Sequence, residues 1–179
     1  MEWQRVNTTV SGSPQLSFVY TCLFSVQFAE YVVYISYHSK DPQSKKFAQD
    51  LEVFLDRKKK PTFRDGSVLA PGDKREEREK AIRASLVFLP ILSKHYSEGV
   101  AGEEFRYNRE EAGKPLLPVV MHDAVIPGDY KVNSEDWPLW IDVPEDYDEK
   151  QDIIFESILK GVNKIQERLR GMILHACMH

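Results

Sequence analysis

The chain has 179 residues, 42% of them hydrophobic and 29% charged, which is the composition of one soluble globular domain with room for a full core. Its formal net charge of −4 argues against the basic surface that a nucleic-acid partner requires. Cys22 and Cys177 lie near opposite ends at no motif spacing. We therefore expect no disulfide framework, and a reducing, cytoplasmic location is the simpler interpretation.

Residues 1–29 precede the first predicted strand, and we expect them to form an irregular or strand-like extension. Within them, Leu16 to Phe28 (LSFVYTCLFSVQF) is apolar, but the basic and small-residue flanks of a signal peptide are missing. No run in the chain reaches the roughly 18 apolar residues of a membrane span. A membrane-seeking leader is the alternative interpretation of this segment.

Strand-like runs and amphipathic helical patterns alternate along the rest of the chain. Runs rich in β-branched and aromatic residues predict strands at 32–36, 61–63, 86–92, 116–121 and 139–143. Because strands and helical patterns alternate along most of the chain, the sequence predicts an α/β fold, with a central parallel sheet between two layers of helices.

The predicted helices have recognisable beginnings and ends. Asp41 is expected to be an N-cap with Pro42 at the first helical position, and cations at 57–60 end that helix. Asp73 and Glu76 form an acidic capping pair for a helix whose mixed-charge run is expected to be a solvated face. The remaining predicted helices cover residues 103–112, ended by Gly113, and residues 154–169.

Three segments place polar groups just past the ends of apolar runs, where open α/β sheets bind ligands. They are the run Tyr31–Tyr37 (YVVYISY) with its polar turn, Phe63-Arg64-Asp65 with the later Ala70-Pro71-Gly72, and Glu103-Glu104-Phe105. Their order and spacing resemble a TIR domain (Toll/interleukin-1 receptor/resistance protein). We assign residues 30–170 to this domain and residues 171–179 to a C-terminal tail. The resemblance implies a flavodoxin-like five-stranded sheet in the order 2-1-3-4-5.

The resemblance also implies a candidate catalytic carboxylate. TIR domains with enzymatic activity cleave NAD, as substrate rather than cofactor, using a glutamate in a Trp-x-x-x-Glu-Leu/Ile setting. In the stretch from Val100 to Phe105 (VAGEEF), Glu104 takes this position, Val100 replaces the tryptophan, and Glu103 is the alternative. A carboxylate there can stabilise an oxocarbenium-like sugar without a general acid. From the residues alone, the simpler explanation is that both acids are favourable charges at a helix N-terminus.

The substrate-binding candidates come from the same resemblance. In the family, the turn after the first strand lines the nucleotide pocket. Tyr37 offers a ring for stacking, while Ser36, Ser39 and Lys40 offer groups for a hydroxyl or a phosphate. We add Phe63, at the end of the second predicted strand, to this set.

The loop after the second predicted strand is the candidate interface. TIR domains dock onto one another through a loop at this place, which implies the interface residues Arg64, Asp65, Val68, Leu69, Pro71 and Gly72. The alternative is an ordinary loop whose apolar residues fold back onto the sheet, although clustered exposed apolar residues more often mark contacts.

Two weaker patterns have simpler explanations. Trp137 and Trp140 flank the last predicted strand and are expected to pack in the core. The terminal pattern His175-x-Cys177-x-His179 lacks a fourth ligand, so we expect no metal site.

Two functions follow from these patterns and stay open. The first is an intracellular signalling protein that assembles with itself and other TIR domains and hydrolyses NAD to nicotinamide and ADP-ribose or a cyclic form. The second is a non-catalytic TIR adaptor that acts only by protein–protein contact. Glu104 and the long loop favour the first, and the absent tryptophan favours the second.

Overall fold

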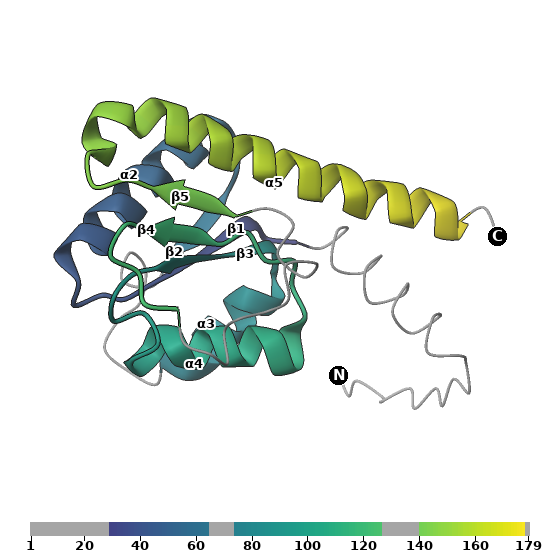
Figure 1. Cartoon of the computed structure of the whole chain (residues 1–179). Coiled ribbons are helices and arrows are strands. Elements are labelled where there is room, and N and C mark those ends of the chain that lie inside the picture. Colours follow the sequence, from purple (N-terminus) through teal and green to yellow (C-terminus); the bar gives the residue numbers. More distant parts are fainter. Residues whose placement is uncertain (1–28, 65–73, 127–139, 178–179) are drawn as a thin grey trace.

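One parallel sheet of five strands, in the order β2-β1-β3-β4-β5, forms the centre of the molecule (Figure 1). The structure is a computed structural model and describes residues 29–64, 74–126 and 140–177. Its strands are β1 (Tyr31–Tyr37), β2 (Thr62–Arg64), β3 (Ser85–Leu92), β4 (Val119–Met121) and β5 (Ile141–Val143). The predicted parallel sheet and strand order are confirmed.

The two longest strands, β1 and β3, pair with each other in the interior of the sheet. Tyr34 lies opposite Phe88, and Ile35 lies opposite Leu89. Every residue of β3 is buried, as expected for a strand covered on both faces. Successive side chains of β1 therefore point alternately into two separate helix layers.

Helices cover both faces of the sheet. Their bounds are α2 (Pro42–Arg57), α3 (Lys74–Arg83), α4 (Gly99–Tyr107) and α5 (Tyr147–Cys177). Figure 1 shows α2 and α5 on one face and α3 and α4 on the other. Each layer has its own apolar cluster: Phe47, Leu51 and Ile158 belong to the first, and Phe88, Ile82 and Phe105 to the second.

The start of α2 follows the predicted capping pattern. The side chain of Asp41 accepts a hydrogen bond from the backbone nitrogen of Gln43 at 3.0 Å, and Pro42 takes the first helical position. The cap fixes the direction in which the chain leaves β1, and it thereby positions the turn from His38 to Lys40.

The third predicted helix begins earlier than expected. Instead of starting at residue 103, α4 starts at Gly99, whose φ of 61° favours glycine at the turn into the helix. A π-helical turn, Asn108–Ala112, follows it and ends at Gly113. Glu103 and Glu104 therefore lie beyond the first turn, which contains no acidic residue. Their position weakens the explanation that they only complement the helix N-terminus.

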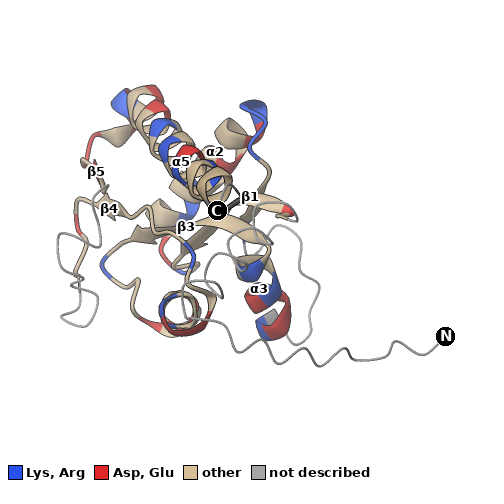
Figure 2. Ribbon diagram, turned by 90° about the vertical axis from the view of Figure 1, so that its right-hand side faces the viewer, with Lys and Arg blue, Asp and Glu red and all other residues tan. Residues whose placement is uncertain are grey.

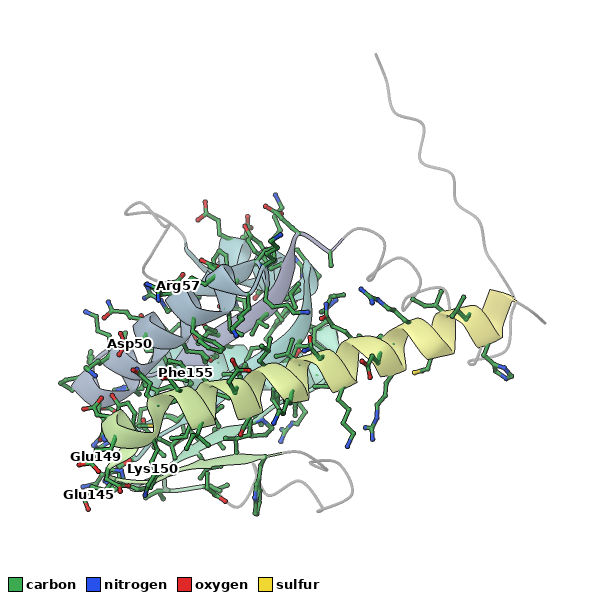
Figure 3. The ribbon with its side chains drawn as sticks, turned by 90° about the horizontal axis from the view of Figure 1, so that it is seen from above. Asp50, Arg57, Glu145, Glu149, Lys150 and Phe155 are labelled. Carbon is green, nitrogen blue, oxygen red and sulfur yellow. The ribbon has the colours of Figure 1, made fainter. Side chains whose placement is uncertain are left out.

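The last helix is longer than its apolar stripe predicts. Figure 3 shows Phe155 on α5, where its ring lies 5.3 Å from that of Phe47 on α2. The helix continues through Cys177, so residues 171–177, which we had assigned to a tail, are helical. This part of α5 extends past the edge of the sheet (Figure 1). None of the helices in the described part of the chain is both long and apolar enough to cross a membrane.

One of the two tryptophans expected in the core is exposed. Trp140 directly precedes the edge strand β5 and is 57% exposed, so the prediction was wrong for this residue. An edge strand has a neighbour on one side only, which leaves its flanks open to solvent. Trp137 lies outside the described residues.

The packing between β1, β3 and α4 leads to a prediction about stability. Phe88 is fully buried and its ring stacks on Tyr34 at a centroid distance of 5.5 Å. Phe88→Ala should therefore lower the free energy of unfolding by about 3–5 kcal/mol, since the cavity lies between two packed layers. Ile153→Ala, at an exposed position on α5, should change it by less than about 1 kcal/mol. Urea unfolding measures both, and equal losses would contradict the packing described here.

Candidate functional site

A buried glutamate lies where α4 crosses the carboxyl end of β1. Glu104 is only 5% exposed, and both of its carboxylate oxygens accept hydrogen bonds from β1. The Tyr34 hydroxyl donates to Oε1 at 2.9 Å, and the Ser36 hydroxyl donates to Oε2 at 2.6 Å. Tyr34 and Ser36 are two residues apart and so point to the same face of the sheet.

A third hydroxyl extends this network. The oxygens of Ser36 and Tyr96 lie 2.7 Å apart, and Tyr96 is buried just after β3. Because Ser36 has one proton and gives it to Glu104, it accepts the proton of Tyr96. The chain of donors from Tyr96 through Ser36 fixes the direction of the carboxylate.

A cation from α3 lies beside this carboxylate. The Nε of Arg78 lies 3.6 Å from Oε1 of Glu104, and the Arg78 side chain is 12% exposed. The mixed-charge run of α3, in which acidic and basic residues lie side by side (Figure 2), was expected to be a solvated face. For Arg78 that prediction was wrong, because this residue shares the inward face of the helix with Ile82, four positions later.

Glu104 borders two hollows. The first, the β1 hollow, has a volume of about 350 Å³ and lies between the turn after β1 and the start of α4. Ser39, Lys40, Val100 and Ala101 are among its lining residues. The second, the α3–α4 hollow, has about 320 Å³, and its lining includes Arg78 and Glu103. Each is at the small end of the range for ligand sites.

The β1 hollow combines one buried carboxylate with a mixed rim. Lys40 can meet a phosphate or carboxylate, Ser39 a hydroxyl, and Val100 presents an apolar surface. The hollow lies at the carboxyl ends of the strands, next to the turn that follows β1. A small polar ring or a sugar would reach the carboxylate of Glu104 there, and the chemistry available is charge stabilisation and hydroxyl binding.

The chain matches a known protein family over most of its length. The family model for the TIR domain matches residues 33–156, which include most of β1 and Glu104. The chain belongs to the TIR domain family. No curated protein sequence matches it.

Solved TIR domains resemble the chain at low sequence identity. The TIR domain of the Toll-related receptor TRR-2 from Hydra magnipapillata is 14% identical over 74% of this chain and 98% of its own, with a TM-score of 0.53. That likeness shows the TIR fold. The TIR domains of the activated Roq1 resistosome, which recognises the pathogen effector XopQ, are 20% identical over 75% of this chain and 84% of theirs, with a TM-score of 0.45.

The TIR fold brings most of the predicted substrate-binding residues to Glu104. Tyr37, Ser39 and Lys40 line the β1 hollow with it, while Ser36 is buried against its carboxylate. Glu104 borders both hollows, whereas Glu103, the alternative carboxylate, lines the α3–α4 hollow and not the β1 hollow. The geometry therefore separates the two acids that the sequence leaves as alternatives.

Phe63 does not line the β1 hollow. Its ring stacks on that of Tyr34 at 5.3 Å within the apolar cluster beneath α3 and α4. Phe63 is the middle residue of β2, and its side chain points to the face of the sheet that this cluster covers. We therefore remove Phe63 from the substrate-binding set and regard it as support for Tyr34.

Arg64 also faces inward rather than toward a partner. Its Nε donates to Oε2 of Glu52 at 2.7 Å, and its Nη1 donates to the Tyr37 hydroxyl at 3.1 Å. Its guanidinium also lies over the Tyr37 ring at 5.8 Å, which occupies one face of the ring predicted to stack on substrate. Burial opposes the charge of Arg64, but the pair with Glu52 outweighs it and raises the pKa of Arg64. The other interface candidates, Asp65, Val68, Leu69, Pro71 and Gly72, lie outside the described residues.

The Arg64–Glu52 pair is open to a direct test. Arg64→Met leaves Glu52 without its cation and should lower the free energy of unfolding by about 2–3 kcal/mol, below the full cost of breaking a buried pair because Glu52 keeps some exposure. Lys46→Met, which breaks the exposed pair with Asp148, should cost less than about 1 kcal/mol. Urea denaturation of both variants gives the comparison, and a cost for Arg64→Met as small as that for Lys46→Met would assign Arg64 to the surface.

Proposed function

We propose that this TIR domain is a signalling protein that cleaves NAD between nicotinamide and ribose, with Glu104 as the catalytic carboxylate. The observation that carries the proposal is a buried, oriented carboxylate at the edge of the β1 hollow. The proposed location is the cytoplasm, where NAD is available.

The reaction needs few protein groups. The bond between ribose C1′ and the nicotinamide nitrogen breaks, and its electron pair stays on that nitrogen, so nicotinamide leaves neutral. The cationic sugar left behind is stabilised by the negative charge of Glu104. Water then forms the new bond to C1′ and loses a proton to solvent, which gives ADP-ribose. Attack by a nitrogen of the adenine ring would give a cyclic product instead.

The rim of the β1 hollow supports the same substrate. Ser39 offers a hydroxyl to the ribose, and Lys40 offers a cation to the diphosphate. Each carboxylate oxygen of Glu104 accepts one internal hydrogen bond and can accept a second, so Glu104 can meet a ribose hydroxyl while Tyr34 and Ser36 stay bound.

Assembly is the second part of the proposal. The partners are other copies of this chain and other TIR domains, and the contact uses the loop that contains Asp65, Val68, Leu69, Pro71 and Gly72. Val68 and Leu69 are apolar residues in a segment rich in glycine and proline, which is typical of a docking loop. A loop that docks on a different surface of the next copy builds an open assembly rather than a closed dimer.

A non-catalytic adaptor is the second candidate function. Val100 stands where NAD-cleaving TIR domains have tryptophan, and it leaves the β1 hollow without a large ring on that side. Both Glu104 oxygens are also already hydrogen-bonded inside the protein. In this case Glu104 holds α4 to β1, and the domain acts only through TIR–TIR contacts.

One assay separates the two functions. Purified protein is incubated with NAD across a concentration series and the products are separated by chromatography. Equal amounts of nicotinamide and an ADP-ribose product, released faster per molecule as the protein assembles, would support catalysis. Absence of nicotinamide at every concentration, from protein that does self-associate, would favour the adaptor.

A further inference from the structure

The carboxylate of Glu104 sits in a place that disfavours its charge. It is almost fully buried, and removing a carboxylate from water favours the protonated form unless a cation compensates. Its hydrogen-bond donors on β1, Tyr34 and Ser36, favour the ionised form but bring no positive charge to offset its burial. A protonated Glu104 would lose the charge that the proposed chemistry needs.

We propose that Arg78 is a positioning residue that keeps Glu104 ionised from the side opposite the substrate. Its Nε lies 3.6 Å from Oε1, within the range at which an opposite charge stabilises a carboxylate. Arg78 is itself largely buried, so solvent screens the pair weakly. This inference deepens the proposed function and rests on it for its catalytic meaning.

The two hollows separate the roles of the two residues. Arg78 lines the α3–α4 hollow, whereas the described lining of the β1 hollow includes Glu104 and not Arg78. Glu104 therefore faces substrate on one side and its counter-ion on the other. Arg78 acts on the reaction through the charge of Glu104 and touches no reacting atom.

Other titratable groups lie around the carboxylate, and their charges also act on its protonation. Tyr34 and Tyr96 approach it from β1 and from the end of β3. Across the α3–α4 hollow lie Arg75, Glu79, Glu103 and Arg106. Across the β1 hollow lie His38, Lys40 and Glu98. An ion pair with Glu104 is observed for Arg78.

The experiment compares three substitutions on α3. Arg78→Met keeps most of the side chain and removes the charge, whereas Arg78→Lys keeps the charge. Arg75→Met is the matched control, since Arg75 is on the same helix but its side chain is 74% exposed and pairs with Glu79. The titration of the Glu104 carboxyl carbon is followed by ¹³C NMR, and its signal is assigned from its absence in Glu104→Gln.

The expected result is a shift in proton uptake by Glu104. In Arg78→Met, Glu104 should take up its proton about one pH unit or more higher than in the wild type. Arg78→Lys and Arg75→Met should titrate close to the wild type. An unchanged titration in Arg78→Met, or an equal shift in Arg75→Met, would overturn the inference. If Arg78→Met does not fold, Arg78→Gln supplies the same neutral comparison.

Thermal unfolding provides a second measurement that needs no activity. The wild-type pair contributes stability above the usual pKa of a glutamate, and that contribution is lost as the pH falls and Glu104 is protonated. The difference in melting temperature between the wild type and Arg78→Met should therefore be largest near pH 7 and shrink toward pH 4. The same Arg78→Met substitution, made in the Glu104→Gln protein, should change the melting temperature little at any pH. A large change in that protein would contradict the pairing.

Activity then separates this inference from the proposed function. In an active protein, the acidic limb of the pH profile for nicotinamide release should move upward in Arg78→Met by the same amount as the NMR titration. A shifted NMR titration in a protein that releases no nicotinamide would support the ion pair and reject NAD cleavage. If Arg78→Met releases nicotinamide and the acidic limb stays at the wild-type pH, only the role of Arg78 is rejected, and the proposed function is not.

Discussion

Glu104→Gln is expected to lower the rate of NAD cleavage by about 10²-fold or more. Glutamine keeps the size of the side chain; its amide oxygen can accept the hydrogen bond of one hydroxyl, Tyr34 or Ser36, and its NH2 group can donate to the oxygen of the other. It lacks the negative charge that stabilises the cationic sugar. Nicotinamide release, measured by chromatography at a concentration where the wild type is active, gives the comparison.

Glu103→Gln is the matched control for this experiment. Glu103 is the adjacent residue of α4, yet it is exposed and lines the other hollow. Its substitution should change the rate by a few-fold at most. Equal activity of the wild type and Glu104→Gln would reject Glu104 as the catalytic carboxylate, and loss of activity in Glu103→Gln alone would assign the role to Glu103.

Leu69→Asp is expected to abolish self-association and, with it, any activity that requires assembly. The prediction rests on the sequence, because Leu69 lies outside the described residues. A carboxylate placed in an apolar contact loses its hydration without gaining a partner, which disfavours association strongly. Light scattering across a concentration series measures the change, and Pro71→Glu should act in the same direction.

Val53→Asp is the control for the introduced charge. Val53 is an exposed valine on α2, and α2 lies on the face of the sheet away from α3 and α4. This variant should self-associate as the wild type does. The circular dichroism spectra of Leu69→Asp, Pro71→Glu and Val53→Asp should all match that of the wild type. If Leu69→Asp and Pro71→Glu both self-associate as the wild type does, the loop is only an ordinary connection between β2 and α3.

The fold followed from local patterns in the sequence. Continuous apolar runs such as the one from Leu86 to Leu92 predict buried parallel strands, and Asp41-Pro42 predicts the start of a helix because cap and backbone chemistry are local. The start of α4 was missed since Gly99 also resembles a loop residue, and no polar side chain caps this helix. The exposure of Trp140 was missed although the expected strand order places the last strand at the edge of the sheet, because the tendency of tryptophan to be buried is an average that takes no account of position in a sheet.

The site was predicted only in part, for a similar reason. Ser36, Ser39, Lys40 and Glu104 follow from motif positions, but the roles of Tyr34 and Arg78 depend on which helix covers which face of the sheet. Two signals were nevertheless present. Tyr34 shares a strand face with Ser36, and Arg78 lies one helical turn before the buried Ile82. Each pair places a polar group inside the molecule, where it needs a partner.

The central claim is that NAD binds in the β1 hollow beside Glu104, and amide NMR tests it most directly. The Glu104→Gln protein, which should bind NAD without cleaving it, is titrated with NAD and its backbone amides are followed. The account predicts the largest shifts at Ser39, Lys40, Val100 and Ala101, with smaller shifts at Arg106 and Tyr107 of the α3–α4 hollow. Amides of the β1 hollow that stay unmoved at millimolar NAD, or shifts confined to another surface, would contradict it.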